Sequence, residues 1–195
     1  MCGGKGTRLE SAREKPLHPI AGTPMVDRVL AALRESAVET IHCAVSPNAP
    51  ETRAHLESAA GAATIETAGE GYVTDLMELL ERPVISPPVL TVAADLPLLE
   101  APVVDRVLAA HGDGTGSRTV CVPAALKRRL GVSIDSRLEP NDHLAPTGVN
   151  VVGTTDDTTA MTDVSYDPRL AVNVNRLEDA RIAADRLRSS TAGGN

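Results

Sequence analysis

The chain has 195 residues, of which 42% are apolar, so it is long enough for one domain with a sizeable core. Its formal net charge of −7 argues against the basic face of a nucleic-acid-binding protein, and no apolar run reaches the roughly 18 residues of a membrane span. The three cysteines are widely spaced and form no zinc-binding pattern. We therefore expect a single domain over residues 1–195, in the cytoplasm, with no nucleic-acid partner and no membrane span.

Strand and helix patterns alternate along the chain. Helical periodicity predicts helices over residues 25–36, 50–61, 74–82, 101–111 and 177–188. Short apolar or β-rich runs predict strands over residues 40–45, 63–67, 88–95, 118–123, 148–153 and 170–175. Such alternation predicts an α/β fold, Rossmann-like and three-layered, with a mostly parallel central sheet flanked by helices. Residues 189–195 are expected to form a disordered tail.

The segment "GGKGTR" at residues 3–8 is rich in glycine. Glycine lets backbone N–H groups turn toward a phosphate because no Cβ stands in the way. Lys5 or Arg8 could then neutralise the phosphate charge. The segment fits neither the P-loop pattern nor the dinucleotide-binding pattern, so both of those sites are disfavoured. Taken alone, it is equally compatible with a flexible chain end.

The residues that follow the glycine segment give it a context. Lys15 and Pro16 come seven and eight positions after Arg8, and "AGTPMVDRVL" begins at residue 21. This order resembles the N-terminal signature of sugar-nucleotide and related nucleotidyltransferases. The resemblance implies a nucleotide-diphospho-sugar transferase type of fold, in which the loop wraps a triphosphate and Arg8 and Lys15 stabilise charge on the transferred phosphate and on pyrophosphate. The loop positions predicted to bind the nucleotide are Gly3, Gly4, Lys5, Gly6 and Thr7.

The run "VLTVAADLPLL" at residues 89–99 predicts a buried strand that ends in Asp95. In open α/β sheets, ligands bind outside the carboxyl ends of the strands, and a carboxylate there can hold Mg²⁺. A turn or helix cap is the alternative role. The strand followed by Asp-Leu-Pro resembles the metal aspartate of the same superfamily. That resemblance implies that Asp95 is catalytic and binds Mg²⁺.

The segment "NVNRLEDA" at residues 173–180 places two asparagines two positions apart. On a strand, Asn173 and Asn175 would face the same side, although one could instead cap the following helix. The pattern is similar to the end of the molybdenum-cofactor-type nucleotidyltransferases. It implies that Asn175 helps to hold the metal and that Asn173 contacts the nucleotide.

The segment "TAGEGYVTDL" at residues 67–76 is a candidate for base recognition. Gly69 and Gly71 would let the backbone approach a base closely. Asp75 offers two acceptor oxygens, which suit the N1–H and the exocyclic amine of guanine. The same residue could equally lie in the first turn of a helix, where the helix dipole favours a negative charge.

The chain as a whole resembles the archaeal guanylyltransferases of the cobalamin pathway, through "AVSPNAPET" (44–52), "GEGYVTDL" (69–76) and "NVNRLEDARIAADRL" (173–187) in addition to the motifs above. This resemblance implies GTP and a corrinoid phosphate, adenosylcobinamide phosphate, as substrates and Mg²⁺ as the cofactor. A homodimer is a candidate assembly. The alternatives are a molybdenum cofactor guanylyl- or cytidylyltransferase and a catalytically inactive GTP-binding regulatory protein.

The start of the chain departs from that family, and the acceptor site has no recognisable motif. Family members begin with a short apolar strand directly before the glycine loop, and here at most Met1 remains of it. We therefore expect either a preceding strand outside this sequence or a weakened sheet. No motif marks the acceptor site, so we assign it to the irregular segment 131–148, which carries Asp135, Asn141 and Asp142.

Overall fold

The computed structural model describes residues 1–2, 9, 11, 13–58, 62–155 and 161–192. The glycine segment 3–8 lies outside the described residues, so the predictions for Gly3, Gly4, Lys5, Gly6, Thr7 and Arg8 stay predictions. The helices are η1 (Lys15–Leu17), α1 (Met25–Arg34), α2 (Pro50–Ser58), α3 (Tyr72–Leu80), α4 (Ala101–His111), α5 (Ala124–Leu130), α6 (Pro168–Ala171) and α7 (Leu177–Ala192). The strands are β1 (Pro19–Ile20), β2 (Thr23–Pro24), β3 (His42–Val45), β4 (Ala63–Glu66), β5 (Val89–Val92), β6 (Arg118–Pro123), β7 (Leu144–Val152) and β8 (Met161–Val164).

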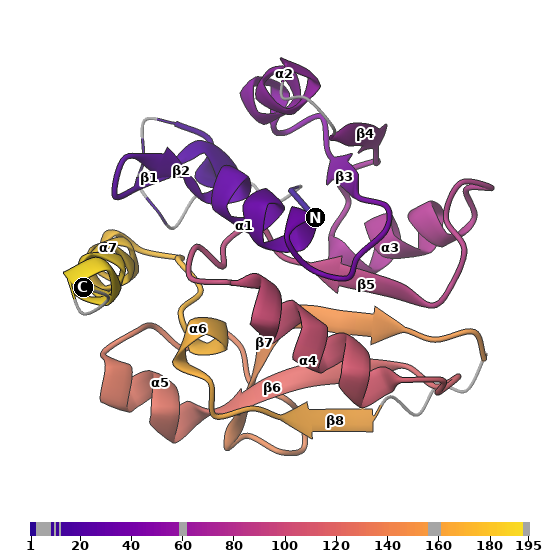
Figure 1. The fold of residues 1–195 in the computed structure, drawn as a ribbon. Coiled ribbons are helices and arrows are strands. Elements are labelled where there is room, and N and C mark those ends of the chain that lie inside the picture. The colour runs from indigo at the N-terminus through magenta and orange to yellow at the C-terminus, as the bar shows by residue number, and fades with distance from the viewer. Residues whose placement is uncertain (3–8, 10, 12, 59–61, 156–160, 193–195) are drawn as a thin grey trace.

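The main sheet has four strands in the order β5-β7-β6-β8 (Figure 1). Strand β7 is antiparallel to both β5 and β6, whereas β8 is parallel to β6. Strands β3 and β4 form a separate parallel pair, and β1 and β2 form a short hairpin. The α/β architecture is confirmed, but the sheet is mixed and not mostly parallel, because β7 runs against both of its neighbours.

One face of the main sheet is covered by α1 and α4 (Figure 1). Val29 of α1 and Val103, Val104 and Val107 of α4 are buried in the same cluster as Val92, Val120, Val122, Val149 and Val151 of the strands. In a chain without Phe or Trp, these aliphatic side chains must supply the apolar area that stabilises the domain. Each fully buried valine or leucine contributes roughly 1.5–3 kcal/mol relative to exposure.

The first two residues connect the two sheets. The amino group of Met1 donates to the carbonyl of Val92 (3.0 Å), and the carbonyl of Met1 accepts from the amide of Ala94 (3.4 Å). On the other side, the amide of Cys2 donates to the carbonyl of Ala44 (2.9 Å). Within the described residues, β3 otherwise pairs only with β4 and β5 only with β7. Met1 and Cys2 therefore lie between β3 and β5, near the middle of the molecule (Figure 1).

Several sequence predictions were wrong at particular elements. Residues 170–175 are not a strand: Leu170 and Ala171 belong to the short helix α6, and Val172 to Asn175 form an extended segment with no strand assignment. Pro168 favours this helix start, and the Asp167 side chain caps it by accepting from the Arg169 amide. The expected tail is also wrong for residues 189–192, which continue α7.

Helix α5 and strand β8 are two of the elements that had no clear signal in the sequence. Helix α5 has only seven residues and lies in a segment that reads as polar and irregular, and β8 is a four-residue edge strand with an exposed Met161 and Val164. Short elements of this kind depend on their neighbours and not on their own periodicity. None of the helices in the described part of the chain combines the length and apolar character needed to cross a membrane.

Candidate active site at the end of strand β5

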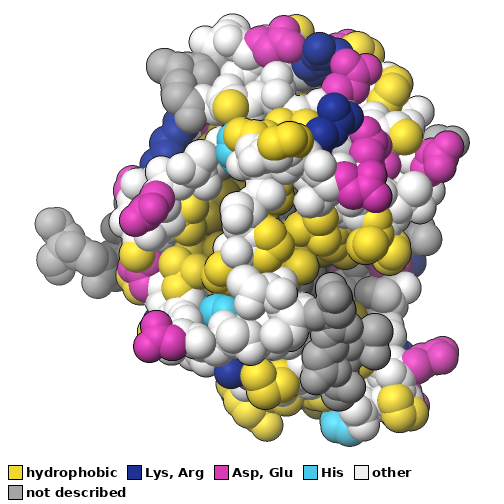
Figure 2. All heavy atoms as spheres, turned by 90° about the vertical axis from the view of Figure 1, so that its right-hand side faces the viewer, with side chains coloured by type: hydrophobic (Ala, Val, Ile, Leu, Met, Phe, Trp, Pro, Cys, Tyr) yellow, Lys and Arg dark blue, Asp and Glu magenta, His cyan; other side chains and the backbone are white. Residues whose placement is uncertain are grey.

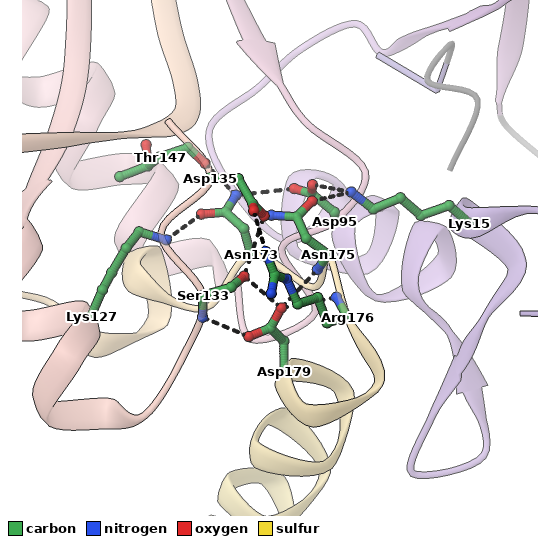
Figure 3. Close-up of polar contacts among 10 residues, drawn as sticks. All are labelled: Lys15, Asp95, Lys127, Ser133, Asp135, Thr147, Asn173, Asn175, Arg176 and Asp179. Carbon is green, nitrogen blue, oxygen red and sulfur yellow. Dashed lines mark hydrogen bonds and ion pairs between the residues drawn. The ribbon is translucent and has the colours of Figure 1, made fainter. Parts of the chain in front are cut away.

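Three side chains from distant parts of the sequence meet just beyond β5. The Lys15 ammonium in η1 donates to Asp95 Oδ2 (2.7 Å) and to Asn175 Oδ1 (2.6 Å) (Figure 3). The side chains of Lys15 and Asp95 are each 18% exposed, so the pair is open to a ligand but largely sheltered from water. The structure thus brings together the predicted catalytic lysine, the predicted metal aspartate and the predicted second metal ligand.

Contacts of the neighbouring residues position the segments that carry Lys15 and Asn175. Glu14, directly before η1, accepts from the amides of Glu51 (2.9 Å) and Thr52 (2.7 Å), so its carboxylate satisfies the first turn of α2. At the other end, the Val174 amide donates to the Asp95 carbonyl (2.9 Å). Lys15 and Asn175 are therefore each held by a neighbouring residue, and their side chains approach Asp95 from two separate segments.

Asn173 supports Asp95 from behind. Its Nδ2 donates to Asp95 Oδ1 (3.0 Å) and to the Thr147 carbonyl (2.8 Å), and the residue is buried. Both amide hydrogens are therefore used inside the protein, where they fix the orientation of the Asp95 carboxylate. Asn173 and Asn175 both contact the group around Asp95, although the segment that carries them is not a strand. A direct nucleotide contact by Asn173 stays a prediction.

Lys127 of α5 is a part of the site that the sequence analysis missed. It is 3% exposed, and its ammonium donates to Asn173 Oδ1 (2.9 Å) and to the Ala171 carbonyl (2.8 Å). Burial lowers the pKa of Lys127, and the charges of nearby aspartates, Asp95 first among them, act in the opposite direction. In Figure 3, Lys127 and Lys15 reach the cluster from opposite sides. The sequence "AALKRRL" gave no sign of this role, since three consecutive basic residues suggest a solvated surface.

Asp179 ties the last segment of the site together. Its Oδ2 accepts from the amides of Asn175 (3.1 Å) and Arg176 (2.9 Å) and from Ser133 Oγ (2.8 Å), and its Oδ1 accepts from the Ser133 amide (2.8 Å). Asp179 is 1% exposed. The carboxylate thus caps the start of α7 and holds the loop after α5 beside Asn175 (Figure 3).

A cavity of about 530 Å³ opens beside this cluster. This volume lies within the range of small-molecule sites, which is roughly 300–1,000 Å³. Asp95, Asn173, Asn175 and Lys127 line it from the cluster. Its other lining residues include Tyr72, Ser133, Asp135, Ser136, Gly148 and Asn150. The wall behind Asp95 is tight. A Cβ on Gly148, whose φ is +83°, would lie 2.7 Å from Ala93 Cβ, so only glycine fits there.

Tyr72 brings an aromatic ring to the cavity. Its hydroxyl hydrogen-bonds Thr91 Oγ1 (2.8 Å) and accepts from Asn150 Nδ2 (2.9 Å), while the residue remains 43% exposed. The ring is therefore held by its polar end with part of its surface open. The chain contains two tyrosines and neither Phe nor Trp, so an aromatic ring at the cavity stands out.

The predicted base-recognition segment forms a tight loop before α3. Asp75 is 3% exposed, and its Oδ1 accepts from the amides of Gly69 (2.9 Å) and Glu70 (3.2 Å). It lies in the first turn of α3, as one of the two sequence interpretations proposed. Gly69 and Gly71 both have positive φ, and a Cβ on Gly69 would lie 2.8 Å from Ser46 Cβ. Asp75 shapes this loop, and its contact with a guanine stays a prediction.

The candidate acceptor segment is only partly at the cavity. Asp135 lines it and pairs with Arg176 (3.2 Å), whereas Asn141 and Asp142 are exposed and are not among its lining residues. The two ends of the 131–148 segment therefore border the cavity, through Ser133 to Ser136 and through Pro146 and Gly148, whereas its middle, with Asn141 and Asp142, does not.

The residues around Asp95 fit a magnesium ion. Two hard oxygen donors, Asp95 Oδ2 and Asn175 Oδ1, converge on one cation in the structure, the Lys15 ammonium. Mg²⁺ prefers such oxygens and is usually held by one or two carboxylates together with substrate phosphates. In the described part of the chain, no three His, Cys, Asp or Glu side chains form a complete protein cage for a metal. The donor set therefore suits a metal that arrives with a phosphate ligand.

A glycine-rich N-terminus, a cationic side chain and an aspartate at the end of a buried strand define a nucleotidyltransferase class of site on this α/β fold. Residues 1–141 match the family described as the MobA-like NTP transferase domain, and the chain belongs to that family.

Among individual relatives, the chain is similar to the adenosylcobinamide-phosphate guanylyltransferase of Methanocaldococcus jannaschii. The two are 31% identical over 194 residues, which cover 94% of this chain and 93% of the relative. The similarity thus extends beyond the family match to the asparagine segment and α7.

Solved structures of other nucleotidyltransferases share the fold. A Bacillus anthracis protein described as a candidate glucose-1-phosphate thymidylyltransferase, solved with sucrose, has a TM-score of 0.66 at 12% identity and covers 96% of this chain and 93% of its own. A CMP:2-keto-3-deoxy-manno-octonic acid synthetase, solved with CTP, has a TM-score of 0.61 at 14% identity and covers 96% of both chains. At these identities the likeness shows the fold alone, and it confirms the predicted transferase type of fold.

Proposed function

We propose that the chain is a guanylyltransferase that transfers GMP from GTP to adenosylcobinamide phosphate, giving adenosylcobinamide-GDP and pyrophosphate in cobalamin biosynthesis. The observation that carries this proposal is the convergence of Lys15, Asp95 and Asn175 at the edge of a cavity large enough for phosphate groups. Similarity to the Methanocaldococcus guanylyltransferase over nearly the whole chain supports the choice of substrates.

In the proposed reaction, an oxygen of the acceptor phosphate attacks the α-phosphorus of GTP. A new P–O bond forms, the bond to the β-phosphate oxygen breaks, and pyrophosphate leaves with the bonding electrons. The acceptor phosphate is already an anion near neutral pH, so the reaction needs no strong general base. Catalysis then rests on positioning and on neutralisation of the phosphate charge.

Lys15 is the described residue that supplies positive charge at the reacting phosphates, and Arg8 is proposed to supply a second charge from the glycine segment. Asp95 and Asn175 would hold Mg²⁺, which supplies further neutralisation of phosphate charge when it is bound. Asn173 keeps the Asp95 carboxylate turned toward the cavity. The loop that contains Gly69 and Gly71, shaped by Asp75, is proposed to receive the guanine.

The proposal is tested by measuring pyrophosphate release from GTP, ATP, CTP and UTP, each with and without adenosylcobinamide phosphate and Mg²⁺. We expect release to require GTP, the corrinoid phosphate and the metal together, and the product mass to be that of adenosylcobinamide-GDP. Release with molybdopterin in place of the corrinoid would assign the chain to the molybdenum cofactor branch. GTP binding without any release would indicate the inactive regulatory protein.

The assembly and the location of the protein are separate predictions. Light scattering on the purified chain tests the homodimer, and fractionation of the cells that produce the protein tests the cytoplasmic location.

A further inference from the structure

The side chain of Glu14 reaches a helix that lies far from it in the sequence. Its Oε1 accepts from the amide of Glu51 (2.9 Å) and its Oε2 from the amide of Thr52 (2.7 Å), so one carboxylate takes both donors. Hydrogen bonds to a charged acceptor are stronger than those between neutral groups, and the start of a helix favours a negative charge. Glu14 therefore binds the first turn of α2, while the next residue, Lys15, extends to Asp95.

Helix α2 cannot cap these two amides with the side chain that directly precedes it. Ala49 has only a methyl group, although its carbonyl accepts from the Arg53 amide (3.0 Å). Pro50, the first residue of the helix, has no N–H. A serine, threonine, aspartate or asparagine at position 49 would be the usual source of an acceptor. Here the acceptor is Glu14, which lies 37 positions before Glu51.

The start of α2 is itself attached to its neighbours. Ser46 and Ala49 are buried, and the Ala49 amide donates to the Ser46 carbonyl (3.1 Å). Farther along the helix, His55 Nε2 contacts Asp27 Oδ1 of α1 (2.7 Å). The donors that Glu14 binds are therefore fixed both to α1 and to the chain that follows β3.

The outer face of α2 is charged, and the helix buries few side chains. Arg53 pairs with Glu57 (2.8 Å) and with Glu66 of β4 (2.7 Å). Figure 2 shows acidic and basic side chains at the top of the molecule, at the level of α2 in Figure 1. Within this helix, Thr52 and Leu56 are the buried residues. Because little packing stabilises α2, loss of the contact at its start should weaken the helix as well as the segment before η1.

Glu14 also closes the turn that carries Lys15. The carbonyl of Glu14 accepts from the Leu17 amide (2.9 Å), and the carbonyl of Lys15 accepts from the His18 amide (3.1 Å). From this turn, the Lys15 ammonium reaches Asp95 Oδ2 (2.7 Å). A shift of η1 away from α2 would therefore move the ammonium relative to Asp95. Misplacement of a group at the reacting atoms by about 1 Å can cost about 100-fold in rate.

We propose that Glu14 is a positioning residue that fixes Lys15 beside Asp95 by tying η1 to the start of α2. This inference rests on the proposed function, in which the Lys15 ammonium neutralises charge on the reacting phosphates. Both carboxylate oxygens of Glu14 bind amides of α2, so Glu14 contacts neither substrate nor metal in this scheme. It acts on the rate through Lys15 and on stability through α2.

The test compares the variant Glu14→Ala with the double variant Glu14→Ala/Ala49→Ser. The serine hydroxyl supplies an acceptor from the residue directly before α2, so it restores a cap but no connection to η1. In Glu14→Ala, we expect a lower midpoint of urea unfolding and a kcat for guanylyl transfer that is lower by about 10- to 100-fold. In the double variant, we expect the midpoint to recover and kcat to stay low.

The KM for adenosylcobinamide phosphate should stay within about twofold in both variants, because Glu14 is not among the residues that line the cavity beside Asp95. Glu51→Gln is the matched control. It removes one negative charge from the same helix start and leaves the amide donor that Glu14 binds, so its kcat should equal that of the unmodified chain. Glu14→Gln keeps one acceptor oxygen, and its kcat should lie between those of the unmodified chain and Glu14→Ala.

Hydrogen exchange follows the position of the two segments without any substrate. In the double variant, the amides of Leu17 and His18, which bond within the turn at Lys15, should exchange faster than in the unmodified chain. The amides of Glu51 and Thr52 should stay protected, because the serine caps α2.

A double variant that recovers kcat together with stability would overturn the inference, because Glu14 would then act as a helix cap alone. Unchanged exchange at Leu17 and His18 would overturn it as well. If the serine does not restore the midpoint, Glu14→Gln decides: a kcat equal to that of Glu51→Gln contradicts the inference, and a lower kcat at an equal midpoint supports it. No pyrophosphate release by the unmodified chain with GTP and adenosylcobinamide phosphate would instead overturn the proposed function.

Discussion

The two ends of β5 border two regions of opposite character. Beyond its carboxyl end, Asp95 belongs to a cluster in which charged and amide groups hydrogen-bond one another. Its carboxylate accepts from Lys15 (2.7 Å) and from Asn173 (3.0 Å), and Lys15 also donates to Asn175 (2.6 Å). Along its other end, Val89 and Leu90 line an apolar groove of about 680 Å³, whose walls also include Met1 and Cys2. The polar cluster borders a cavity of about 530 Å³, so it can meet a ligand.

Substitutions in the two regions should therefore have different effects on catalysis and on stability. Changes in the polar cluster should alter catalysis far more than stability, because its groups face an open cavity. Changes along the groove should alter stability first, since apolar burial and strand pairing are what the groove provides. The following predictions, from the largest expected effect to the smallest, test this contrast.

The largest effect is expected for the variants Asp95→Ala and Lys15→Ala. Each should lower guanylyl transfer by about 10²- to 10⁴-fold, because each removes a charge next to the reacting phosphates. The midpoint of urea unfolding should change little, since both side chains are partly open to solvent. Pyrophosphate release and urea titration measure the two quantities. Asp185→Asn on the exposed face of α7 is the control, and near-normal turnover in either alanine variant would remove that residue from the mechanism.

Asp179→Ala should lower both the stability of the protein and its catalytic rate. The variant leaves four hydrogen-bond donors of Ser133, Asn175 and Arg176 without their acceptor. We expect a loss of roughly 2–4 kcal/mol in the free energy of unfolding and a 10- to 100-fold lower kcat. Urea unfolding and steady-state kinetics measure these changes. A normal kcat in a destabilised protein would show that Asp179 contributes to stability alone. The polar cluster and the groove would then not differ in the way stated above.

Cys43 gives a pH test on the groove side. Burial raises the pKa of its thiol to about 11, with a contribution from neighbouring Cys2. The folded state therefore holds the proton more tightly than the unfolded state, and stability should fall as pH rises from about 9 through 11. Urea unfolding at pH 7.5 and pH 10 measures the fall. The Cys43→Ala variant should show a smaller fall than the unmodified chain, and an identical fall in both would exclude Cys43 as its cause.

Asp167→Asn should have the smallest effect. Hydrogen bonds from the Arg169 side chain lower the pKa of Asp167, which also caps α6. The charged form thus stabilises the folded state at neutral pH, and this contribution is lost as pH falls below the usual aspartate range. We expect the variant to lose about 1 kcal/mol at pH 7, because the ion pairs with Arg169 and Arg106 are lost, and the difference from the unmodified chain to shrink as pH falls below the usual aspartate range. An unchanged stability at pH 7 would show that the charge of Asp167 does not stabilise the folded state.

The sequence indicated the site better than it indicated the strands. Lys15, Asp95 and Asn175 could be selected because their residue types and order resemble a known signature, and that order does not depend on the geometry of the elements between them. The strand assigned to residues 170–175 failed because apolar alternation in "LAVNVN" also fits a short helix followed by an extended segment packed under α7. Proline at residue 168 and the cap at Asp167 decided between the two, and their effect is local.

What the sequence determined by itself is the α/β class of the fold, through alternating strand and helix patterns, and the selection of Lys15, Asp95 and Asn175, whose side chains meet in the structure. Only the tertiary structure decided which groups stand behind the site. Lys127 lies 46 residues before Asn173, which it supports, and Asp179 lies four residues after Asn175. Nothing in their local sequence distinguishes a buried partner from a solvated charge. The same holds for the groove beside Met1. Burial and strand pairing depend on which segments meet in space, so they are properties of the folded chain and not of any stretch of it.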